Sequence, residues 1–252
     1  MIALHELIHY INEHLSVDRF RDYCPNGLQL EGRGKVKKII SGVTASQALI
    51  DEAIAKGADA ILVHHGYFWK GESPVISGIK KRRIAALLQH DISLLAWHLP
   101  LDAHPVLGNN AQLALRLGLA KTDEFDKGEK PALGCIGEFS EPLSASDLKL
   151  HINKSINTDC LHLMGSDRPV RRVGWCTGGA QSYFEAAIEA GVDAFITGEV
   201  SEPSYHLAKE YGVNFYAAGH HATERYGVQA LGQHLVEKFS LEHFYFDEPN
   251  PV

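Results

Sequence analysis

Short, almost wholly apolar segments alternate with amphipathic helical patterns along most of this chain, and this alternation restricts the possible folds more than any other feature. A continuous apolar run is typical of a strand that is buried on both faces of a parallel sheet. Strands separated by helices therefore predict an α/β fold with mainly parallel sheets. Strands are expected at 36–43, 58–63, 92–97, 171–176, 192–197 and 213–218, and helices at 2–15, 46–57, 79–90, 111–119, 144–155, 181–191 and 223–239.

The chain also contains an internal repeat. Residues 53–65 ("AIAKGADAILVHH") align with 187–199 ("AIEAGVDAFITGE") at an offset of 134. Residues 92–102 ("ISLLAWHLPLD") align with 214–224 ("NFYAAGHHATE") at an offset of 122. Two linked matches of this kind predict a duplicated helix–strand–helix–strand unit.

The duplication predicts two similar halves. Residues 121–131 ("KTDEFDKGEKP") are charged and resemble a loop, so they are the expected boundary. The first half then covers residues 1–125 and the second half covers residues 126–252.

Histidines and carboxylates directly follow the predicted strands. In open parallel sheets, ligands bind at the carboxyl ends of the strands. Neutral imidazoles and carboxylates are the ligands that two neighbouring divalent cations need. The expected metal ligands are His64, His65, Asp102, His220 and Glu224, with His98 and Glu199 on the same rim.

A structural interpretation competes with this one for each residue alone. His64 and His65 would then hydrogen-bond to backbone carbonyls, whereas Asp102 and Glu224 would stabilise the starts of helices. The complete set favours the metal interpretation, because two copies of a His-x-x-x-carboxylate pattern follow equivalent strands.

The segment "HELIH" (5–9) matches a zinc-protease signature. It lies on a helix whose apolar stripe includes Leu4, Leu7 and Ile11, and no third ligand follows at a metalloprotease spacing. We predict that His5 and His9 have no metal-binding role.

Two further segments are interpreted structurally. "CTGGAQS" (176–182) could cradle an anion, but it lacks the lysine of a phosphate-binding loop and fits a tight turn. Tyr67, Phe68 and Trp69 could line a pocket, and packing is the favoured interpretation. The loop "YCPNGLQLEG" (23–32) has no assigned role.

Composition narrows the class of partner. The 252 residues carry a net charge of −7, which argues against nucleic acid as the main partner. The four cysteines are scattered, so neither a disulfide framework nor a thiolate zinc site is expected. The sequence has no signal-peptide pattern and no apolar stretch of the roughly 18 residues that a spanning helix needs. A cytoplasmic protein without membrane contact is expected.

Seven motifs occur in a fixed order along the chain, and together they resemble the NIF-three-like family, whose members are named GTP cyclohydrolase 1 type 2 homologues. The motifs are "NGLQLEG" (26–32), "HHG" (64–66), "HLPLD" (98–102), "CTGGA" (176–180), "TGE" (197–199), "GHHATE" (219–224) and "NPV" (250–252). The resemblance implies two interlinked halves, a dinuclear metal centre and a toroidal homohexamer. It also implies that the ligands are the five residues named above, with His98 beside the centre.

The expected activity is that of a two-metal hydrolase that acts on a small substrate. If the family name holds, the substrate is GTP, and His98 is the catalytic residue that carries a proton. The alternative is a non-enzymatic metal-binding scaffold or regulatory interaction protein. Two divalent ions per chain are expected, and zinc, iron and manganese all suit the ligands.

Overall fold

The computed structural model describes residues 1–126, 128 and 131–252, and the chain forms two compact units. Unit 1 consists of Met1–Leu101 and Gly227–Pro249. Unit 2 consists of Asp102–Tyr226 and Asn250–Val252. These bounds differ from the single division after residue 125 that the sequence suggests, because each unit takes a segment from beyond that point.

Unit 1 contains a five-stranded sheet with the strand order β13-β4-β5-β6-β2. The strands are β2 (Gly27–Leu30), β4 (Lys38–Thr44), β5 (Ala60–His65), β6 (Ser93–Ala96) and β13 (Glu242–Tyr245). All neighbouring pairs are parallel except β6 with β2, which is antiparallel. A two-stranded antiparallel sheet joins β1 (Ile2–Ala3) to β3 (Lys35–Val36).

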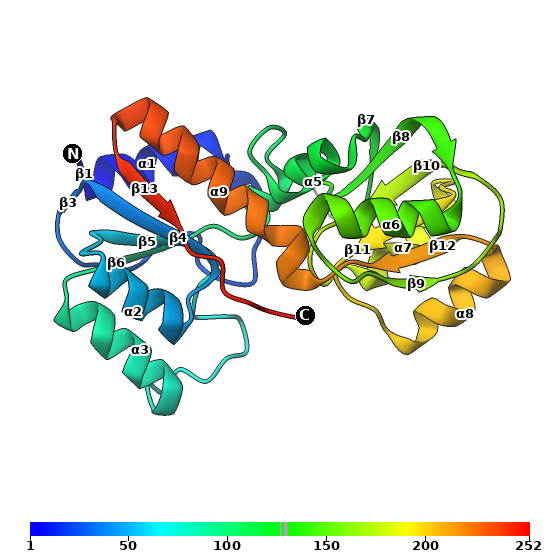
Figure 1. The fold of residues 1–252 in the computed structure, drawn as a ribbon. Helices are drawn as coiled ribbons and strands as arrows, with labels where there is room; N and C mark the ends of the chain where they lie inside the picture. Colours follow the sequence, from blue (N-terminus) through cyan, green and yellow to red (C-terminus); the bar gives the residue numbers. More distant parts are fainter. Residues whose placement is uncertain (127, 129–130) are drawn as a thin grey trace. The chain divides into compact units, whose positions relative to one another are not determined.

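Helices cover both faces of the unit 1 sheet (Figure 1). Helices α2 (Gln47–Ala55) and α3 (Gly78–Gln89) pack side by side on one face. Their apolar side chains join those of β4, β5 and β6 in one core cluster. Helix α1 (Leu4–His14) lies against the part of α9 (His220–Phe239) that belongs to this unit, where Tyr10 packs edge-on against Phe239.

Unit 2 contains a six-stranded sheet with the order β7-β8-β10-β11-β12-β9. The strands are β7 (Ala120–Phe125), β8 (Gly134–Leu143), β9 (Leu161–Leu163), β10 (Val170–Trp175), β11 (Ala194–Thr197) and β12 (Asn214–Ala217). Only the β10–β11 and β11–β12 pairs are parallel, and the other three pairs are antiparallel. The expectation of mainly parallel sheets is therefore correct for unit 1 and wrong for unit 2, and the protein is an α/β protein with mixed sheets.

The two faces of the unit 2 sheet have separate cores. Helices α5 (Asn109–Leu117) and α6 (Ala145–Ile156) pack on the face that buries Trp175, Ile196 and Tyr216. On the other face, Phe184 of α7 (Phe184–Glu189) stacks on Phe195 and contacts Phe215 edge-on. Alternate strand residues point to opposite faces, so Phe195 and Ile196 serve different cores. Two further helices are α8 (Glu202–Tyr211) and the short α4 (Leu99–Ala103).

The internal repeat corresponds to equivalent structure in both units. Asp59 Oδ2 accepts hydrogen bonds from Lys37 N (2.8 Å) and Lys38 N (2.9 Å). Asp193 Oδ2 accepts hydrogen bonds from Arg171 N (3.0 Å) and Arg172 N (2.8 Å), and these residues all follow the 134-residue offset. The repeated aspartate thus fixes the entry of β4 and of β10 in the same way.

The alignment of residues 92–102 with 214–224 is wrong by one residue. Trp97 N donates to Val63 O in unit 1, and Ala218 N donates to Thr197 O in unit 2. Val63 and Thr197 differ by 134, whereas Trp97 and Ala218 differ by 121, not by 122. His98 and His220 therefore follow equivalent strands but do not occupy equivalent positions.

The charged segment 121–131 begins inside unit 2. Its first residues belong to β7, which forms an antiparallel pair with β8 inside unit 2. Residues 127, 129 and 130 of this segment lie outside the described residues. Among the helices that the structure describes, every one is too short or too polar to cross a membrane.

Candidate metal site

Unit 1 brings three imidazoles together at the carboxyl end of its parallel strands. His64 and His65 end β5, and His98 follows β6. One ring nitrogen of each lies within 4.8 Å of those of the other two. His64 is fully buried, and its Nδ1 lies 2.9 Å from the Trp97 carbonyl oxygen. Because a carbonyl only accepts, Nδ1 carries the proton and the lone pair of His64 lies on Nε2.

His98 is held by a carboxylate that the sequence analysis did not single out. Its Nδ1 lies 2.7 Å from Asp22 Oδ1, and the Asp22 side chain is only 3% exposed. Burial favours a raised pKa for Asp22, but the hydrogen bond and charge of His98, with the hydrogen bonds from Asn26 and Tyr23, outweigh it and lower the pKa. Asp22 is therefore an anion at neutral pH that fixes the His98 ring. No sequence signal marks it, because it precedes a loop rather than following a strand.

The loop at 23–32 supports the histidine-bearing loop after β5. Gln29 Oε1 accepts a hydrogen bond from Tyr67 N (2.6 Å), and its amide donates to Pro25 O (2.9 Å). A Cβ at Gly66 would lie 2.7 Å from Gln29 Cδ, so only glycine fits beside this glutamine. The "NGLQLEG" motif, partly formed by β2, thus has a structural role next to the imidazoles.

The three aromatic residues after β5 differ in their surroundings. Tyr67 is buried and donates a hydrogen bond to Ala45 O (2.8 Å), which fits the predicted packing role. Phe68 lies under the Lys80 ammonium group, 4.9 Å from its ring centroid. The partly exposed Trp69 meets His98 edge-on, with 5.0 Å between ring centroids. Trp69 therefore flanks the imidazole cluster instead of packing in the core.

Asp102 lies in unit 2 within a network of buried polar groups. Its Oδ1 accepts hydrogen bonds from Asn109 Nδ2 (2.8 Å) and Thr177 Oγ1 (3.4 Å). A carboxylate oxygen of Asp102 lies within 4.8 Å of one from Glu224, and the two residues are 7% and 3% exposed. Two buried carboxylates this close repel each other unless a proton or a cation compensates their charge.

His220 lies between two carboxylates in the same unit. Its Nδ1 is 2.7 Å from Glu199 Oε1, and its Nε2 is 3.1 Å from Glu224 Oε2. Burial lowers the pKa of His220, but the hydrogen bonds and charges of Glu224 and Glu199 outweigh burial and raise the pKa to about 9. Glu199 occupies the position expected of a residue that orients a metal-binding histidine.

The glycine-rich turn after β10 makes room for this cluster. Gly178 has a φ of +70°, and a Cβ there would overlap the Glu224 carboxylate and lie 3.1 Å from His220 Nε2. Its N–H donates to Thr223 Oγ1 (3.0 Å), and its carbonyl accepts from Thr197 Oγ1 (3.0 Å). The turn "CTGGA" is thus a backbone wall beside the imidazole and carboxylate groups.

His5 and His9 of the "HELIH" segment lie on the exposed side of α1. His9 Nε2 is 3.4 Å from Glu13 one turn further along, while Leu4, Leu7 and Ile11 form the buried stripe. That this match has no metal-binding role stays a prediction.

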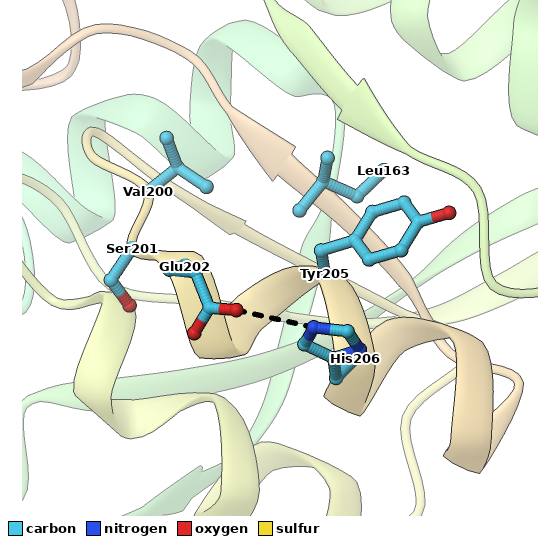
Figure 2. Close-up of a pocket in the computed structure, with 6 residues that line it drawn as sticks. All are labelled: Leu163, Val200, Ser201, Glu202, Tyr205 and His206. Carbon is cyan, nitrogen blue, oxygen red and sulfur yellow. Dashed lines mark hydrogen bonds and ion pairs between the residues drawn. The ribbon is translucent and has the colours of Figure 1, made fainter.

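Unit 2 also has a shallow pocket of about 360 Å³. It lies beside the first turns of α8, and Glu202 pairs with His206 across 3.2 Å (Figure 2). Its lining residues are Leu163, Val200, Ser201, Glu202, Tyr205 and His206. The lining, as far as the chain is described, includes none of the predicted metal ligands.

The donors fit divalent cations in each unit considered separately. Unit 1 offers three clustered imidazoles, and unit 2 offers two buried carboxylates with an imidazole that carboxylates orient. Mixed nitrogen and oxygen donors of this kind suit zinc, iron or manganese. The structure therefore contains His, Asp and Glu clusters compatible with a metal site, and the exact ligand set and the proton-transfer role of His98 stay predictions.

Both units have mixed parallel and antiparallel sheets covered by helices, and histidines and carboxylates lie near the ends of their parallel strands. The chain is therefore an α/β protein with candidate metal-binding clusters. Comparison with protein families is more specific. Residues 2–251 match the model of Duf34/NIF3 (NGG1p interacting factor 3), and the chain belongs to this family.

The relatives cover the whole chain. The protein named GTP cyclohydrolase 1 type 2 homolog from Pseudomonas aeruginosa is 53% identical over 251 residues, which is 100% of this chain and 99% of the relative. The protein of the same name from Escherichia coli K12 is 54% identical over 249 residues, 98% of each chain. A solved structure described as protein ybgI of unknown function matches with a TM-score of 0.95 at 52% identity over 100% of both chains. The TTHA1606 structure from Thermus thermophilus matches with a TM-score of 0.88 at 33% identity, also over 100% of both.

Proposed function

We propose that this chain is a metal-dependent hydrolase that acts on a small substrate, with a nucleotide as the first class to test. The proposed ligands are His64, His65, Asp102, His220 and Glu224. The observation that carries the proposal is the pair of carboxylates in unit 2. Burying Asp102 and Glu224 close together is costly for a protein unless a proton or a cation compensates their charge, and a bound divalent ion would compensate both carboxylates at once.

The surrounding residues prepare these ligands for cations. The Trp97 carbonyl fixes the His64 ring with its lone pair on Nε2. Glu199 orients His220, and Asn109 orients Asp102. Partners of this kind hold ligands in place and fix their protonation state, which supports binding of an ion by the folded chain.

Hydrolysis is the reaction class that such a donor set serves best. Divalent ions bound by imidazoles and carboxylates acidify water and stabilise the negative charge that develops during hydrolysis. The residues of this chain contribute the binding groups, and the burial of His64, Asp102 and Glu224 strengthens the interactions of charges there. The name GTP cyclohydrolase 1 type 2 homolog, which several relatives carry, makes GTP the first substrate to assay.

The test compares metal-free protein with protein reconstituted with zinc, iron(II) or manganese. Each form is assayed with GTP and then with a panel of nucleotides and phosphoesters. We expect turnover only in the metal-loaded form, and a loss of about 100-fold or more in Asp102→Asn, because even residues that only orient ligands contribute about 10–100-fold. His9→Ala, on the exposed side of α1, is the control that keeps full activity.

Stoichiometric metal without turnover of any compound in the panel would contradict the hydrolase proposal. It would favour the alternative in which the metals stabilise a scaffold or an interaction protein. Turnover that persists at full rate after metal removal would contradict a metal-dependent reaction.

A further inference from the structure

We propose that Trp69 stacks against a planar heteroaromatic ring of the substrate, such as a nucleobase, beside the imidazoles of unit 1. Trp69 lies in the loop between β5 and α3. This inference rests on the proposed function and deepens it, because it assigns a residue that selects the class of substrate.

Trp69 is accessible, whereas the other two tryptophans of the chain are not. Trp97 and Trp175 are fully buried, and Trp69 is partly exposed. The Trp69 ring meets His98 edge-on, with 5.0 Å between centroids, and lies 5.9 Å from the His65 ring at a tilt of 58°. Neither imidazole stacks on the indole. A large aromatic ring beside two of the clustered imidazoles is therefore available to a bound molecule.

The backbone of the preceding residue, Phe68, has an unfavourable conformation. Its φ of +64° lies in the left-handed region, which bulky side chains rarely adopt. The two consecutive aromatic rings then lie in different places, because Phe68 packs against the core cluster of unit 1 and Trp69 lies beside His98. Strained residues persist only where the surrounding structure holds them, and they are concentrated at ligand-binding sites. The strain at Phe68 thus favours a functional role for the position of Trp69.

Hydrogen bonds fix the loop around Trp69. Its backbone N–H donates to Glu72 Oε2 (3.1 Å), and its carbonyl accepts from Glu72 N (2.9 Å). Lys80 pairs with the same glutamate across 3.2 Å. The indole N–H donates to Gly66 O (3.2 Å). The indole is therefore positioned before a ligand binds, which reduces the conformational entropy lost on binding.

The chemistry of the indole indicates the class of ligand. Its single polar atom donates to Gly66 O, so the indole offers a ligand an aromatic face and no further hydrogen bond. Aromatic side chains stack on all bases, since every base has a π-face. A ring stacked on Trp69 lies next to His65 and His98. Trp69 should therefore select planar rings over aliphatic groups, without selecting guanine over adenine.

The experiment uses the unmodified, zinc-loaded protein and three probes, GMP, AMP and ribose 5-phosphate. Ribose 5-phosphate has the sugar and the phosphate of the two nucleotides but no base. Tryptophan fluorescence reports on the stacking, because Trp69 is exposed while Trp97 and Trp175 are buried. We expect GMP and AMP to quench this fluorescence and to bind more tightly than ribose 5-phosphate, which should not quench it.

Calorimetric affinities of two variants provide the second readout. Trp69→Leu should weaken the binding of GMP by about 5- to 150-fold, as expected for the loss of one base stack, and leave that of ribose 5-phosphate unchanged. Trp69→Phe keeps an aromatic face, so it should retain most of the GMP affinity while the quenching is lost. Both variants should bind as much zinc as the unmodified protein. Phe244→Leu is the matched control, because it removes an exposed aromatic ring from β13 of the same unit, and GMP affinity should not change.

The outcomes separate this inference from the proposed function. If GMP and AMP bind no more tightly than ribose 5-phosphate, the stacking role is overturned, and turnover of the phosphoester panel still decides the hydrolase proposal. Equal weakening of GMP and ribose 5-phosphate in Trp69→Leu, or a loss of zinc, would also overturn the stacking role, because Trp69 would then only support the imidazole cluster. Base-dependent binding by a metal-loaded protein that turns over no compound in the panel would contradict the proposed function alone.

Discussion

At the scale of single residues, Gly178 shows how a backbone position determines what the site can contain. The residue has a positive φ and leaves space that the Glu224 carboxylate fills. Glycine is therefore needed there for two reasons, one conformational and one steric.

We predict that Gly178→Ala weakens metal binding as well as folding, because the added methyl group displaces the Glu224 carboxylate. Gly191→Ala is the matched control, since Gly191 has a φ of +74° and open space around its Cβ position. Both variants should lose about 1–2 kcal/mol of stability from the left-handed backbone conformation. Only Gly178→Ala should also lose metal, as measured by elemental analysis. Equal metal content in the two variants would show that the Glu224 position is unimportant.

The half-buried His243 makes the unfolding free energy of the protein depend on pH. Its Nε2 lies 2.7 Å from Ser41 Oγ, and burial lowers the pKa of the ring below its ordinary value of 6.5. Between the lowered pKa and 6.5, the unfolded chain binds a proton that the folded chain does not bind. This contribution to stability is therefore complete above pH 6.5 and decreases as the pH falls below it.

We expect His243→Gln to flatten the decrease in unfolding free energy between pH 6.5 and pH 5, measured by urea denaturation. His9→Gln, which alters an exposed histidine, should retain the slope of the unmodified protein. A slope in His243→Gln as steep as in the unmodified protein would show that other groups cause the pH dependence.

At the scale of elements, the duplicated aspartates explain why the two units share a strand arrangement. Asp59 and Asp193 each accept two backbone N–H groups at the entry of a strand. We predict that Asp59→Ala and Asp193→Ala each destabilise the protein by about 1–3 kcal/mol, because backbone donors lose a charged acceptor. Chemical denaturation monitored by circular dichroism measures both. A loss below about 0.5 kcal/mol, as is usual for surface substitutions, would mean that the repeat has no structural role.

The sequence predicts the elements with a clear apolar pattern and misses those without one. All six predicted strands are present, because each contains a short apolar run and lies inside a sheet. Strand β8 escapes prediction because its second half is largely exposed and polar. Helix α8 escapes because only Ser204 and Ala208 are buried, so it has no apolar stripe. The antiparallel pairs of unit 2 all involve β7, β8 or β9, strands that the apolar pattern does not predict.

The candidate site also contains residues that the sequence predicts and residues that it misses. His64 and His65 end an apolar strand and His220 begins the helix after another, so the apolar pattern marks all three. Asp22 is not marked, since its role depends on a contact with His98, 76 residues further along the chain. The one-residue shift in the repeat is also invisible in the sequence, because only the backbone hydrogen bonds of β6 and β12 reveal it.

At the scale of the whole molecule, the family resemblance predicts assembly into a toroidal homohexamer. Closed symmetric homo-oligomers are common among soluble proteins, which agrees with this expectation. Sedimentation velocity at micromolar concentration should give a single species of about six chains. A monomer would contradict the predicted ring without affecting the metal assignment, which rests on the residues of the chain itself.

The metal content of reconstituted protein tests the central claim most directly. We predict two divalent ions per chain by elemental analysis, and a clear loss in His65→Ala and in Glu224→Ala, which remove a ligand from unit 1 and from unit 2. The double variant His5→Ala with His9→Ala should bind as much metal as the unmodified protein. A metal content near zero in the unmodified protein, or an unchanged content in both ligand variants, would contradict the account.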